Sequence, residues 1–507
     1  MQETDPMTQR STTIPAPAGS GLDEPLAIPS GDLLIGGEWT AAASGARRDQ
    51  LDPSTGQPIA SIASGGAADV GQAIASASDA FAAWSAWPAQ RRRDVLLELA
   101  RLIDERELEL GVLRSLETGA PLKRKRGPSL AAEWTRYYAG WVDKIEGSSA
   151  TPYSGPSVSF TVPEPYGVVA VLTPWNGGMV SAAMKVAPAL AAGNTVVLKP
   201  AELAALGPLR FAELCLEAGI PAGVLNVVPG GADAGAALVS DRRVGKISFT
   251  GGGATARRIM EAAAQTLTPV VLELGGKSAD LVFPDADLDV AAMTVVQASL
   301  ANLAGQGCVL PTRLLVHDAV YDEVQAKVTA MAESIRVGRP FDEGVQMGPI
   351  IDSVNCERIL VTIERARAQG AGELLTGGHR VEGELADGYF VAPTVFGSVD
   401  NTSELAQQEV FGPVLALVRF GDEDEAIALA NESDYGLGGL VYTRDIDRAH
   451  RVAKRLRAGY VGINTFPPMP PNAPFGGVKQ SGFGREGGRE GLMEFLQIKN
   501  VYVGLSS

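Results

Sequence analysis

"GVVAVLTPWNGGMVSAAMKVAPALAAGNTVVLKP", residues 167–200, predicts a strand, a helix and a second strand in direct succession. Residues 167–175 and 194–200 are short apolar runs rich in β-branched residues, which is typical of strands. Residues 181–193 between them are rich in alanine and end in glycine, as helices often do. Because both strands are apolar throughout, the unit indicates a parallel sheet that is covered on both faces.

The same alternation continues toward the C-terminus. We expect helices at 206–218, 233–241 and 254–266, with strands at 224–230, 244–250 and 269–276. This pattern predicts a doubly wound, Rossmann-like α/β domain whose ligand lies beyond the carboxyl ends of the strands. After Pro284 the alternation restarts, which predicts a second α/β domain with helices at 287–303, 321–338 and 447–459 and strands at 312–318, 413–420 and 439–445.

A chain of 507 residues is too long for one ordinary core, so two or three domains are expected. A helical pair at 67–84 and 90–118 precedes the first sheet. Residues 157–167 and 496–504 are β segments that could pair outside either core. The predicted organisation is a disordered tail (1–30), an NAD-binding domain (31–146 and 167–274), a catalytic domain (275–483) and a small β oligomerisation arm (147–166 and 484–507).

Composition excludes several classes of protein. The net charge of −16 disfavours partners such as nucleic acid and anionic membranes. The basic run Lys123–Arg126 is interpreted as a solvated surface patch. Three scattered cysteines favour a reducing cytoplasm, and three widely separated histidines give no metal-ligand pattern. No apolar run approaches the ~20 residues that span a bilayer, and the N-terminus lacks the apolar core of a signal peptide.

Two glycine-rich motifs resemble nucleotide-binding sites. "GGKS" (275–278) lacks the earlier glycine of a P-loop, because position 271 is valine. "GGGATA" (251–256) fits G-x-G-x-x-A between a strand and a helix, so Gly251 and Gly252 are candidates for binding a pyrophosphate. An acid about 20 residues further on should bind the adenosine ribose, and Glu273 stands there. On this reading Glu273 is either a ribose ligand or a catalytic base.

Polar residues follow two other predicted strands. In "LKPAE" (198–202), Lys199 and Glu202 stand where a dinucleotide should lie, and a carboxylate there can accept both ribose hydroxyls and repel a 2′-phosphate. In "TPWN" (173–176), Asn176 could donate an amide N–H to an oxyanion. Each motif also has a simpler interpretation. Lys199 and Glu202 could form an exposed ion pair, and Asn176 could be an ordinary turn-forming asparagine.

The cysteines differ in their surroundings. Cys215 lies in a predicted helix and suits a small buried hydrophobe, while Cys356 lies in a polar stretch expected at a helix surface. Cys308, in "AGQGCVL" (304–310), follows a predicted helix in a loop of small residues that leaves room for a substrate. A Cys–His pair with His317 is possible in principle, but nothing local orients that histidine.

Together these stretches resemble the NAD(P)+-dependent aldehyde dehydrogenase superfamily. The resemblance covers nearly the whole chain, and its motifs occur in order: "TPWN", "LKPAE", "FTGG", "LELGGKS", "GQGC", "EVFGPV" (409–414) and "PFGG". It implies a small-molecule aldehyde as substrate, NAD as the preferred cofactor with NADP possible, and a homodimer or homotetramer.

The resemblance also assigns roles to residues. It implies that Cys308 is the nucleophile, Glu273 the general base, and Asn176 an oxyanion donor, with Lys185 and Glu486 in a proton relay. Glu202 and Lys199 would then hold the adenosine ribose. The remaining positions implied to contact the cofactor are Thr173, Pro174, Trp175, Gly251, Gly252, Leu274, Glu409 and Phe411.

Several positions depart from the family pattern. Leu303 and Gly252 replace a frequent asparagine and a frequent serine, and Gly177 and Met184 stand where aromatic residues often occur. With "TFPPMPP" (465–471) near the expected mouth, these changes predict a wide apolar tunnel for medium or large aldehydes. The expected reaction is oxidation to the acid through a cysteine thiohemiacetal and thioester. The alternatives are a CoA-acylating semialdehyde dehydrogenase and a non-catalytic protein with the same fold.

Overall fold

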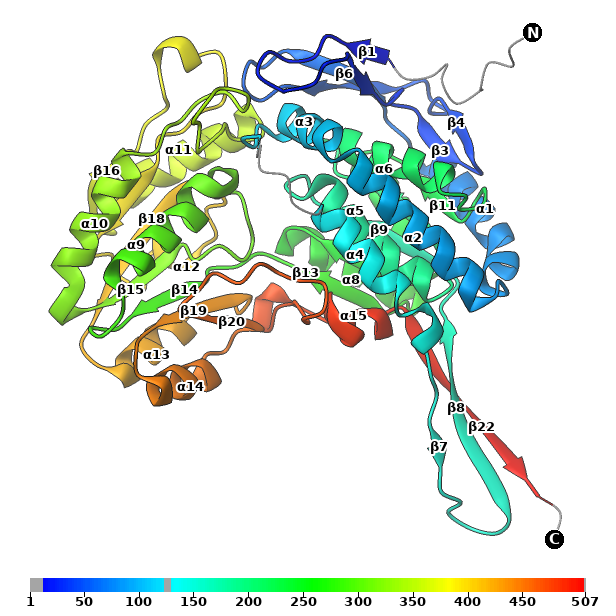
Figure 1. The fold of residues 1–507 in the computed structure, drawn as a ribbon. Coiled ribbons are helices and arrows are strands. Elements are labelled where there is room, and N and C mark those ends of the chain that lie inside the picture. Colours follow the sequence, from blue (N-terminus) through cyan, green and yellow to red (C-terminus); the bar gives the residue numbers. More distant parts are fainter. Residues whose placement is uncertain (1–11, 123–128, 506–507) are drawn as a thin grey trace.

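The computed structural model describes residues 12–122 and 129–505, so the basic run Lys123–Arg126 lies outside the described residues. Within them the chain forms two α/β bodies and a projecting β arm (Figure 1). Each body is built on its own sheet, in agreement with the predicted Rossmann-like domain, second α/β domain and arm.

The first body contains a mostly parallel sheet of eight strands in the order β21-β13-β12-β9-β10-β11-β3-β4. Its strands are β3 (Leu33–Ile35), β4 (Glu38–Thr40), β9 (Val168–Leu172), β10 (Thr195–Lys199), β11 (Leu225–Val227), β12 (Val244–Thr250), β13 (Val270–Glu273) and β21 (Gly482–Phe483). The chain runs from β9 through β10 to β11 on one side, then returns to place β12 and β13 on the other. A topological switch point therefore lies between β9 and β12, where open α/β sheets bind ligands.

Helices cover both faces of this sheet. Strand β9 contributes to the apolar core on each face of the sheet, because alternate residues point to opposite faces. Val169 and Val171 are buried in one core, and Val168 and Ala170 are buried in the other. The helices of this body are α1 (Ala67–Ser85), α2 (Ala89–Glu105), α3 (Glu107–Thr118), α4 (Leu130–Ala139), α5 (Gly178–Ala191), α6 (Leu206–Glu217), α7 (Ala232–Ser240), α8 (Gly253–Thr266) and α15 (Gly488–Met493).

The second body contains a seven-stranded sheet in the order β16-β17-β18-β15-β14-β19-β20. Its strands are β14 (Ala279–Val282), β15 (Arg313–His317), β16 (Glu373–Thr376), β17 (Thr394–Gly397), β18 (Val414–Phe420), β19 (Gly438–Tyr442) and β20 (Tyr460–Ile463). Its helices are α9 (Leu288–Val296), α10 (Tyr321–Glu333), α11 (Ser353–Ala368), α12 (Glu404–Gln407), α13 (Glu423–Asn431) and α14 (Ile446–Arg455). The sequence analysis missed β14, and it wrongly placed Cys356 at a surface, because the α11 face that carries this cysteine is buried.

The predicted helix at 287–303 ends early. After α9 the chain forms a π-helical turn (Gln297–Ala301) and a short 3₁₀ segment (Asn302–Gly305). By length and composition alone, Leu288–Gly305 could cross a membrane, and 56% of that window is buried inside the protein. The expectation that no apolar run approaches this length therefore does not hold.

Two predicted domain limits differ from the structure. Residues 12–30 are not disordered, because β1 (Thr12–Ile14) pairs with β2 (Leu26–Ile28), whose leucine and isoleucine are buried in the first core. Residues 484–495 are not part of the arm, because α15 packs on α5 and Phe495 is buried in that same core. The hairpin of β5 (Arg47–Leu51) and β6 (Pro58–Ala63) lies beside the first sheet.

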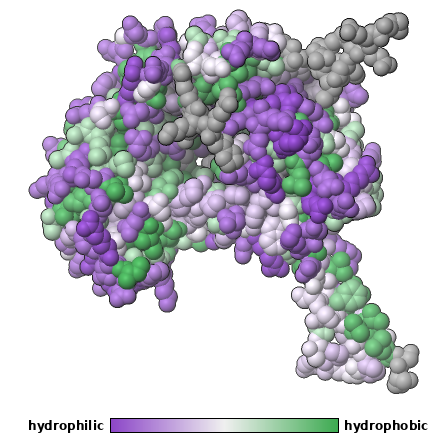
Figure 2. Space-filling model, viewed as in Figure 1, coloured by the Kyte–Doolittle hydropathy of each residue, from purple (hydrophilic) through white to green (hydrophobic). Residues whose placement is uncertain are grey.

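The arm consists of β7 (Ser149–Ala150), β8 (Ser157–Pro165) and β22 (Leu496–Gly504), with β22 pairing along the whole of β8. It projects away from both bodies (Figure 1). Its exposed surface carries apolar side chains, among them Phe160, Ile498 and Val503, and Figure 2 shows apolar residues gathered along it.

A buried acid in the second sheet makes stability depend on pH. Asp280 in β14 is fully buried, and neither carboxylate oxygen has a hydrogen-bond partner among the described residues. Burial raises the pKa of Asp280 well above its usual value. Its stabilising contribution is therefore complete below the unfolded pKa of about 3.9 and is lost as pH rises toward the folded pKa, by about 1.4 kcal/mol per pH unit.

We expect Asp280→Asn to raise the thermal unfolding midpoint at pH 8, with a smaller gain at pH 5. Thermal unfolding of both proteins across this range measures the difference. Asp241→Asn is the matched control, since Arg243 lowers the pKa of that partly exposed carboxyl and its replacement should destabilise slightly. A gap between Asp280→Asn and wild type that shrinks as pH rises would contradict the account.

Candidate active site

The candidate catalytic residues come together at the junction between the two α/β bodies. The short segment 274–278 connects the carboxyl end of β13 to the amino end of β14. Glu273 ends β13, and Cys308 precedes β15, so the acid and the cysteine approach this junction from opposite bodies. A Cβ on Gly276 would lie 2.3 Å from the carbonyl oxygen of Cys308, which shows how tightly the segments pack.

The loop before Cys308 has an unusual backbone. Leu303 (φ 53°) and Ala304 (φ 51°) adopt left-handed conformations, followed by Gly305 (φ 72°). Each left-handed non-glycine residue costs about 1–2 kcal/mol, and asparagine, frequent in the family where this chain has Leu303, tolerates the conformation better. A Cβ on Gly305 would lie 2.1 Å from the carbonyl oxygen of Gly412, so only glycine fits there.

Gln306 braces this loop, a role that the sequence analysis missed. Its buried amide donates to the carbonyl oxygens of Leu303 (2.7 Å) and Pro349 (3.3 Å), and its Oε1 accepts from the N–H of Ile351 (3.0 Å). In the sequence, the only sign of this role is that Gln306 stands two residues before Cys308. These bonds fix the strained turn from both sides, because every polar atom of the amide is used.

Asn176 lies in the loop after β9, next to the switch point. Its Nδ2 donates to the main-chain carbonyl oxygen of Gln306 at 2.9 Å, which brings it to the cysteine loop. An amide nitrogen carries two hydrogens, so this bond orients the group and leaves one N–H for another acceptor. The geometry suits a donor to an oxygen held beside Cys308.

The thiol of Cys308 is partly buried. Burial, followed by the charges of Glu409 and Glu273, raises its pKa to about 12. An apolar cluster of Val309, Leu437 and Phe475 packs against it, with Phe466 and Met469 at its edge. In this state the sulfur is a neutral thiol near pH 7 and needs a base or a cation to become a nucleophile.

Glu273 is almost completely buried, and neither of its carboxylate oxygens has a hydrogen-bond partner among the described residues. Burial, then the charge of Glu486, raises its pKa well above the usual value. Its Oε1 lies 2.6 Å from where a Cβ on Gly476 would be, so the "PFGG" loop leaves this face open only because it is glycine. A raised pKa makes this carboxylate a stronger base than a free carboxylate, which suits a general base.

Lys185 and Glu486 form a buried ion pair behind Glu273. The Lys185 ammonium contacts the Glu486 carboxylate and donates to the Ser248 hydroxyl at 3.1 Å. Ser248 belongs to β12, so the pair joins α5, the central sheet and the C-terminal segment. Because Glu486 and Lys185 both act on the pKa of Glu273, the three groups form one electrostatic unit.

Lys199 and Glu202, the residues predicted to hold the adenosine ribose, lie at and just after the carboxyl end of β10. Lys199 ends β10 and donates to the carbonyl oxygen of Pro200 at 3.2 Å, and burial lowers its pKa. Glu202 is about one-third exposed and lies next to Gly231, where a Cβ would be 3.4 Å from its Oε1. This pair is separate from Glu273, which lies with Cys308, Lys185 and Glu486.

The amino end of α8 lies across the switch point. Gly252 is the N-cap residue, and a Cβ there would meet nothing within 4 Å, so the backbone is open to a ligand. Gly251 donates its N–H to the carbonyl oxygen of Glu273 at 3.0 Å, which fixes the turn. An open helix N-terminus at this point suits a pyrophosphate.

The remaining positions predicted to contact the cofactor include Thr173, Pro174, Trp175, Leu274 and Phe411. Trp175 packs edge-to-face on Phe411 at 5.3 Å, and Phe411 is itself held in a left-handed conformation. Thr173 and Leu274 are buried on either side, with Leu274 donating its N–H to Ser481 at 3.0 Å. Pro174 is half-buried between Thr173 and Trp175.

Glu409 lies between these residues and Cys308. Its Oε1 accepts from the N–H of Gly276 at 2.9 Å. Burial raises the pKa of Glu409 to about 7, an effect that this hydrogen bond and Lys277 partly oppose. A carboxylate at this place can accept ribose hydroxyls.

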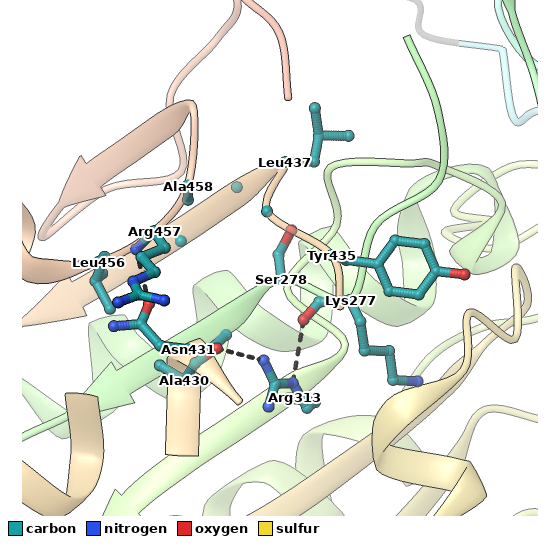
Figure 3. Close-up of a pocket in the computed structure, with 14 residues that line it drawn as sticks. Lys277, Ser278, Arg313, Ala430, Asn431, Tyr435, Leu437, Leu456, Arg457 and Ala458 are labelled. Atoms are coloured by element: carbon teal, nitrogen blue, oxygen red, sulfur yellow. Dashed lines mark hydrogen bonds between the residues drawn. The ribbon is translucent and has the colours of Figure 1, made fainter. Parts of the chain in front are cut away.

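The segment 275–278 is held from below by Arg313, which the sequence analysis did not single out. This buried guanidinium donates to the carbonyl oxygens of Lys277 (3.1 Å) and Ala430 (2.9 Å) (Figure 3). It also donates to the side chain of Asn401 (3.0 Å). A small pocket beside it is lined by Lys277, Ser278 and Tyr435. Arg313 therefore anchors the segment that carries the Glu409 and Cys308 contacts.

Fold and site together define a class of protein: a dinucleotide-binding oxidoreductase with a cysteine and a buried carboxylate at its catalytic junction. The model of the aldehyde dehydrogenase family matches residues 39–501. The chain is 42% identical to a peroxisomal aminoaldehyde dehydrogenase from Pisum sativum (94% of this chain, 96% of the relative). It is 41% identical to a betaine aldehyde dehydrogenase from Cereibacter sphaeroides (94% and 98%).

A crystal structure of betaine aldehyde dehydrogenase from Staphylococcus aureus in complex with NAD+ is similar over 93% of this chain and 94% of that one, with a TM-score of 0.91 and 37% identity. The chain belongs to the aldehyde dehydrogenase family, and the enzyme is an NAD-dependent aldehyde dehydrogenase.

Proposed function

We propose that this enzyme oxidises a medium or large apolar aldehyde to its carboxylic acid by a hydrolytic route. Cys308 is the nucleophile, Glu273 the general base and Asn176 the oxyanion donor, while Lys185 and Glu486 relay protons to and from Glu273. The residues that would hold NAD are Lys199 and Glu202 at the adenosine ribose, Gly251, Gly252 and Trp175 near the pyrophosphate, and Thr173, Pro174, Leu274, Glu409 and Phe411 around the nicotinamide end.

The reaction begins when the Cys308 thiol gives its proton to water, a loss that the positive charge of bound NAD+ would favour, and the sulfur bonds to the aldehyde carbon. The carbonyl oxygen becomes an oxyanion, which accepts from the Asn176 amide and the Cys308 main-chain N–H. Bound NAD+ would accept the hydride that leaves this carbon, so that the C=O bond re-forms and a thioester remains on Cys308. Glu273 removes a proton from water, the water oxygen bonds to the acyl carbon, and the C–S bond breaks to release the carboxylate.

The apolar surroundings of Cys308 carry the substrate proposal. The cluster around it is built from Val309, Leu437 and Phe475 with Tyr460, Phe466 and Met469, so its wall combines aliphatic and aromatic side chains. Gly177 and Met184 stand where the family often has aromatic residues, so they supply no further rings. A quaternary ammonium such as that of betaine aldehyde binds best when aromatic rings surround it on several sides, and we expect the aliphatic part of this wall to favour an uncharged apolar chain instead.

An aldehyde panel with NAD+ and NADP+ tests this proposal. We expect kcat/KM for octanal and benzaldehyde to exceed that for acetaldehyde and for betaine aldehyde by at least tenfold, since each additional methylene buried is worth about 0.8 kcal/mol. Mass analysis of peptides after quenching should place the acyl group on Cys308. Equal or better kcat/KM with acetaldehyde, or a clear preference for betaine aldehyde, would refute the substrate assignment.

The rival reaction is transfer of the acyl group to CoA. The buried Glu273 supports hydrolysis, because a base beside the thioester is what water requires. Product analysis with and without CoA separates the two, with free acid expected in both cases.

We also propose that the enzyme is a homo-oligomer assembled through its arm. The arm carries exposed Phe160, Ile498 and Val503 on a three-stranded sheet that projects from the body. An exposed apolar surface on such a projecting sheet gains by burial against a second copy. Light scattering should give a dimer or tetramer mass.

A further inference from the structure

The two α/β bodies cross at a pair of glycines. A Cβ on Gly348, in the second body, would lie 1.9 Å from the carbonyl oxygen of Gly119, the C-cap residue of α3 in the first body. A Cβ on Gly119 would in turn lie 2.4 Å from the Cγ of Pro349. The N–H of Leu122 donates to the carbonyl oxygen of Pro340 at 2.9 Å, which holds the same two segments together. The bodies are therefore in direct backbone contact at this crossing.

The residues that follow the crossing hold the amide of Gln306. The carbonyl oxygen of Pro349 accepts from its Nε2 at 3.3 Å, and the N–H of Ile351 donates to its Oε1 at 3.0 Å. The third bond of the amide goes to the carbonyl oxygen of Leu303, in the left-handed turn that precedes the cysteine, at 2.7 Å. A shift of the crossing therefore moves the groups that brace this turn.

Other bonds fix the same segment to both bodies. Met347 accepts from the N–H of Gly338 at 3.1 Å, which anchors the segment in the second body. The N–H of Ile350 donates to the carbonyl oxygen of Tyr389 at 2.9 Å, and Tyr389 donates its own N–H to Pro53, between β5 and β6 of the first body, at 3.1 Å. Because the segment is bonded on both sides, the spacing of the two bodies sets its position.

We infer that Gly348 is a positioning residue for Cys308, which acts through Pro349 and Gln306. Without a side chain at Gly348, the bodies approach closely enough for the segment to reach the Gln306 amide. The amide then keeps the turn before the cysteine in its strained conformation, which sets the position of the sulfur. This inference rests on the proposed role of Cys308 as the nucleophile.

Gly348→Ala tests the link, because it adds one methyl group at the crossing. The φ of Gly348 lies outside the left-handed region, so the new Cβ is opposed only by the neighbouring chain. We expect the rate of the NADH burst and the rate of Cys308 alkylation by iodoacetamide to fall about 10- to 100-fold, since a displacement of about 1 Å in a reacting group can cost about that much. Peptide mass analysis distinguishes Cys308 from the buried Cys215 and Cys356.

The affinity for NAD+ separates this effect from general damage. Calorimetry without aldehyde should give a Kd for Gly348→Ala within about threefold of wild type, because distant sites change independently. Gly71→Ala is the matched control, since a Cβ on Gly71 in α1 would meet nothing within 4 Å. Its burst and alkylation rates should equal those of wild type.

A double-mutant cycle shows whether the effect passes through Gln306. In a Gln306→Ala background, Gly348→Ala should slow the burst by less than about twofold more, because the brace is already lost. The same fold-loss in both backgrounds, or a wild-type burst rate in Gly348→Ala, would overturn the inference.

Pro349→Ala serves if Gly348→Ala does not fold. It keeps the carbonyl oxygen that Gln306 uses and removes the ring that lies against Gly119. The burst should again be slower than in wild type, and an unchanged burst would overturn the inference. Absence of an acyl group on Cys308 in the wild-type enzyme would instead reject the proposed nucleophile.

Discussion

Glu273→Gln should form one equivalent of NADH rapidly and then stop. Hydride transfer needs only the thiohemiacetal on Cys308, whereas release of the acyl group needs a base to activate water. The carboxylate of Glu273, which is buried and has no hydrogen-bond partner in the part of the chain that the structure describes, is the base we propose for that second step. Removing a general base costs typically 10²–10⁴-fold, so steady turnover should fall by about that amount while the burst amplitude remains near one per active site.

The pH dependence of steady turnover gives a second test of Glu273 as the base. Because burial and the charge of Glu486 raise the pKa of Glu273, its basic form increases over a higher pH range than that of a free carboxyl group. Wild-type turnover should therefore rise with pH through this pKa, and Glu273→Gln should lose that rise. Stopped-flow absorbance at pH 6 to 9 measures both phases.

Two controls make the result decisive. Cys308→Ser should show no burst, and Glu217→Gln should behave as wild type, because Glu217 is a partly exposed partner of Arg106. If Glu273→Gln abolished the burst and weakened NAD+ binding, Glu273 would be a cofactor ligand and the assignment of the base would be wrong.

Asn176→Ala should lower kcat/KM for the aldehyde by about 10²–10³-fold. The amide is held by the Gln306 carbonyl oxygen at 2.9 Å, with one N–H left for the oxyanion. An oxyanion donor contributes about 2.7–4 kcal/mol in the transition state, and the Cys308 main-chain N–H cannot replace it. NAD+ binding should change little, which calorimetry without aldehyde can check.

Asn500→Ala is the matched control for this variant, because Asn500 lies exposed on β22 and bonds to Ser159 of the arm. Its kcat/KM should equal that of wild type. Activity of Asn176→Ala within fivefold of wild type would show that the main-chain N–H alone stabilises the oxyanion.

Much of the fold followed from local pattern. The strand–helix–strand unit at 167–200, the alternation after it and the two β segments of the arm are all present, since periodicity of apolar residues depends only on neighbours in the chain. The errors lie where tertiary packing overrides that pattern. Residues 12–30 look like a polar tail, but Leu26 and Ile28 are buried by contacts from distant helices.

In the candidate site, too, some residues were predicted from the sequence and others became evident only in the tertiary structure. Its motifs and the resemblance that they carry singled out Cys308, Glu273 and Asn176. The bracing by Gln306 and Arg313 escaped notice, because their partners are main-chain carbonyls tens of residues away, and no sequence spacing encodes such bonds.

The sequence by itself determined the class of enzyme and its two α/β units, and it singled out the candidate reactive side chains. Only the tertiary structure decided the charge and access of those side chains. It buried Glu273 with no hydrogen-bond partner among the described residues, and it joined Lys185 to Glu486. The physical reason is that desolvation and Coulomb interaction depend on distance in space, and residues that are hundreds of positions apart in the chain set them.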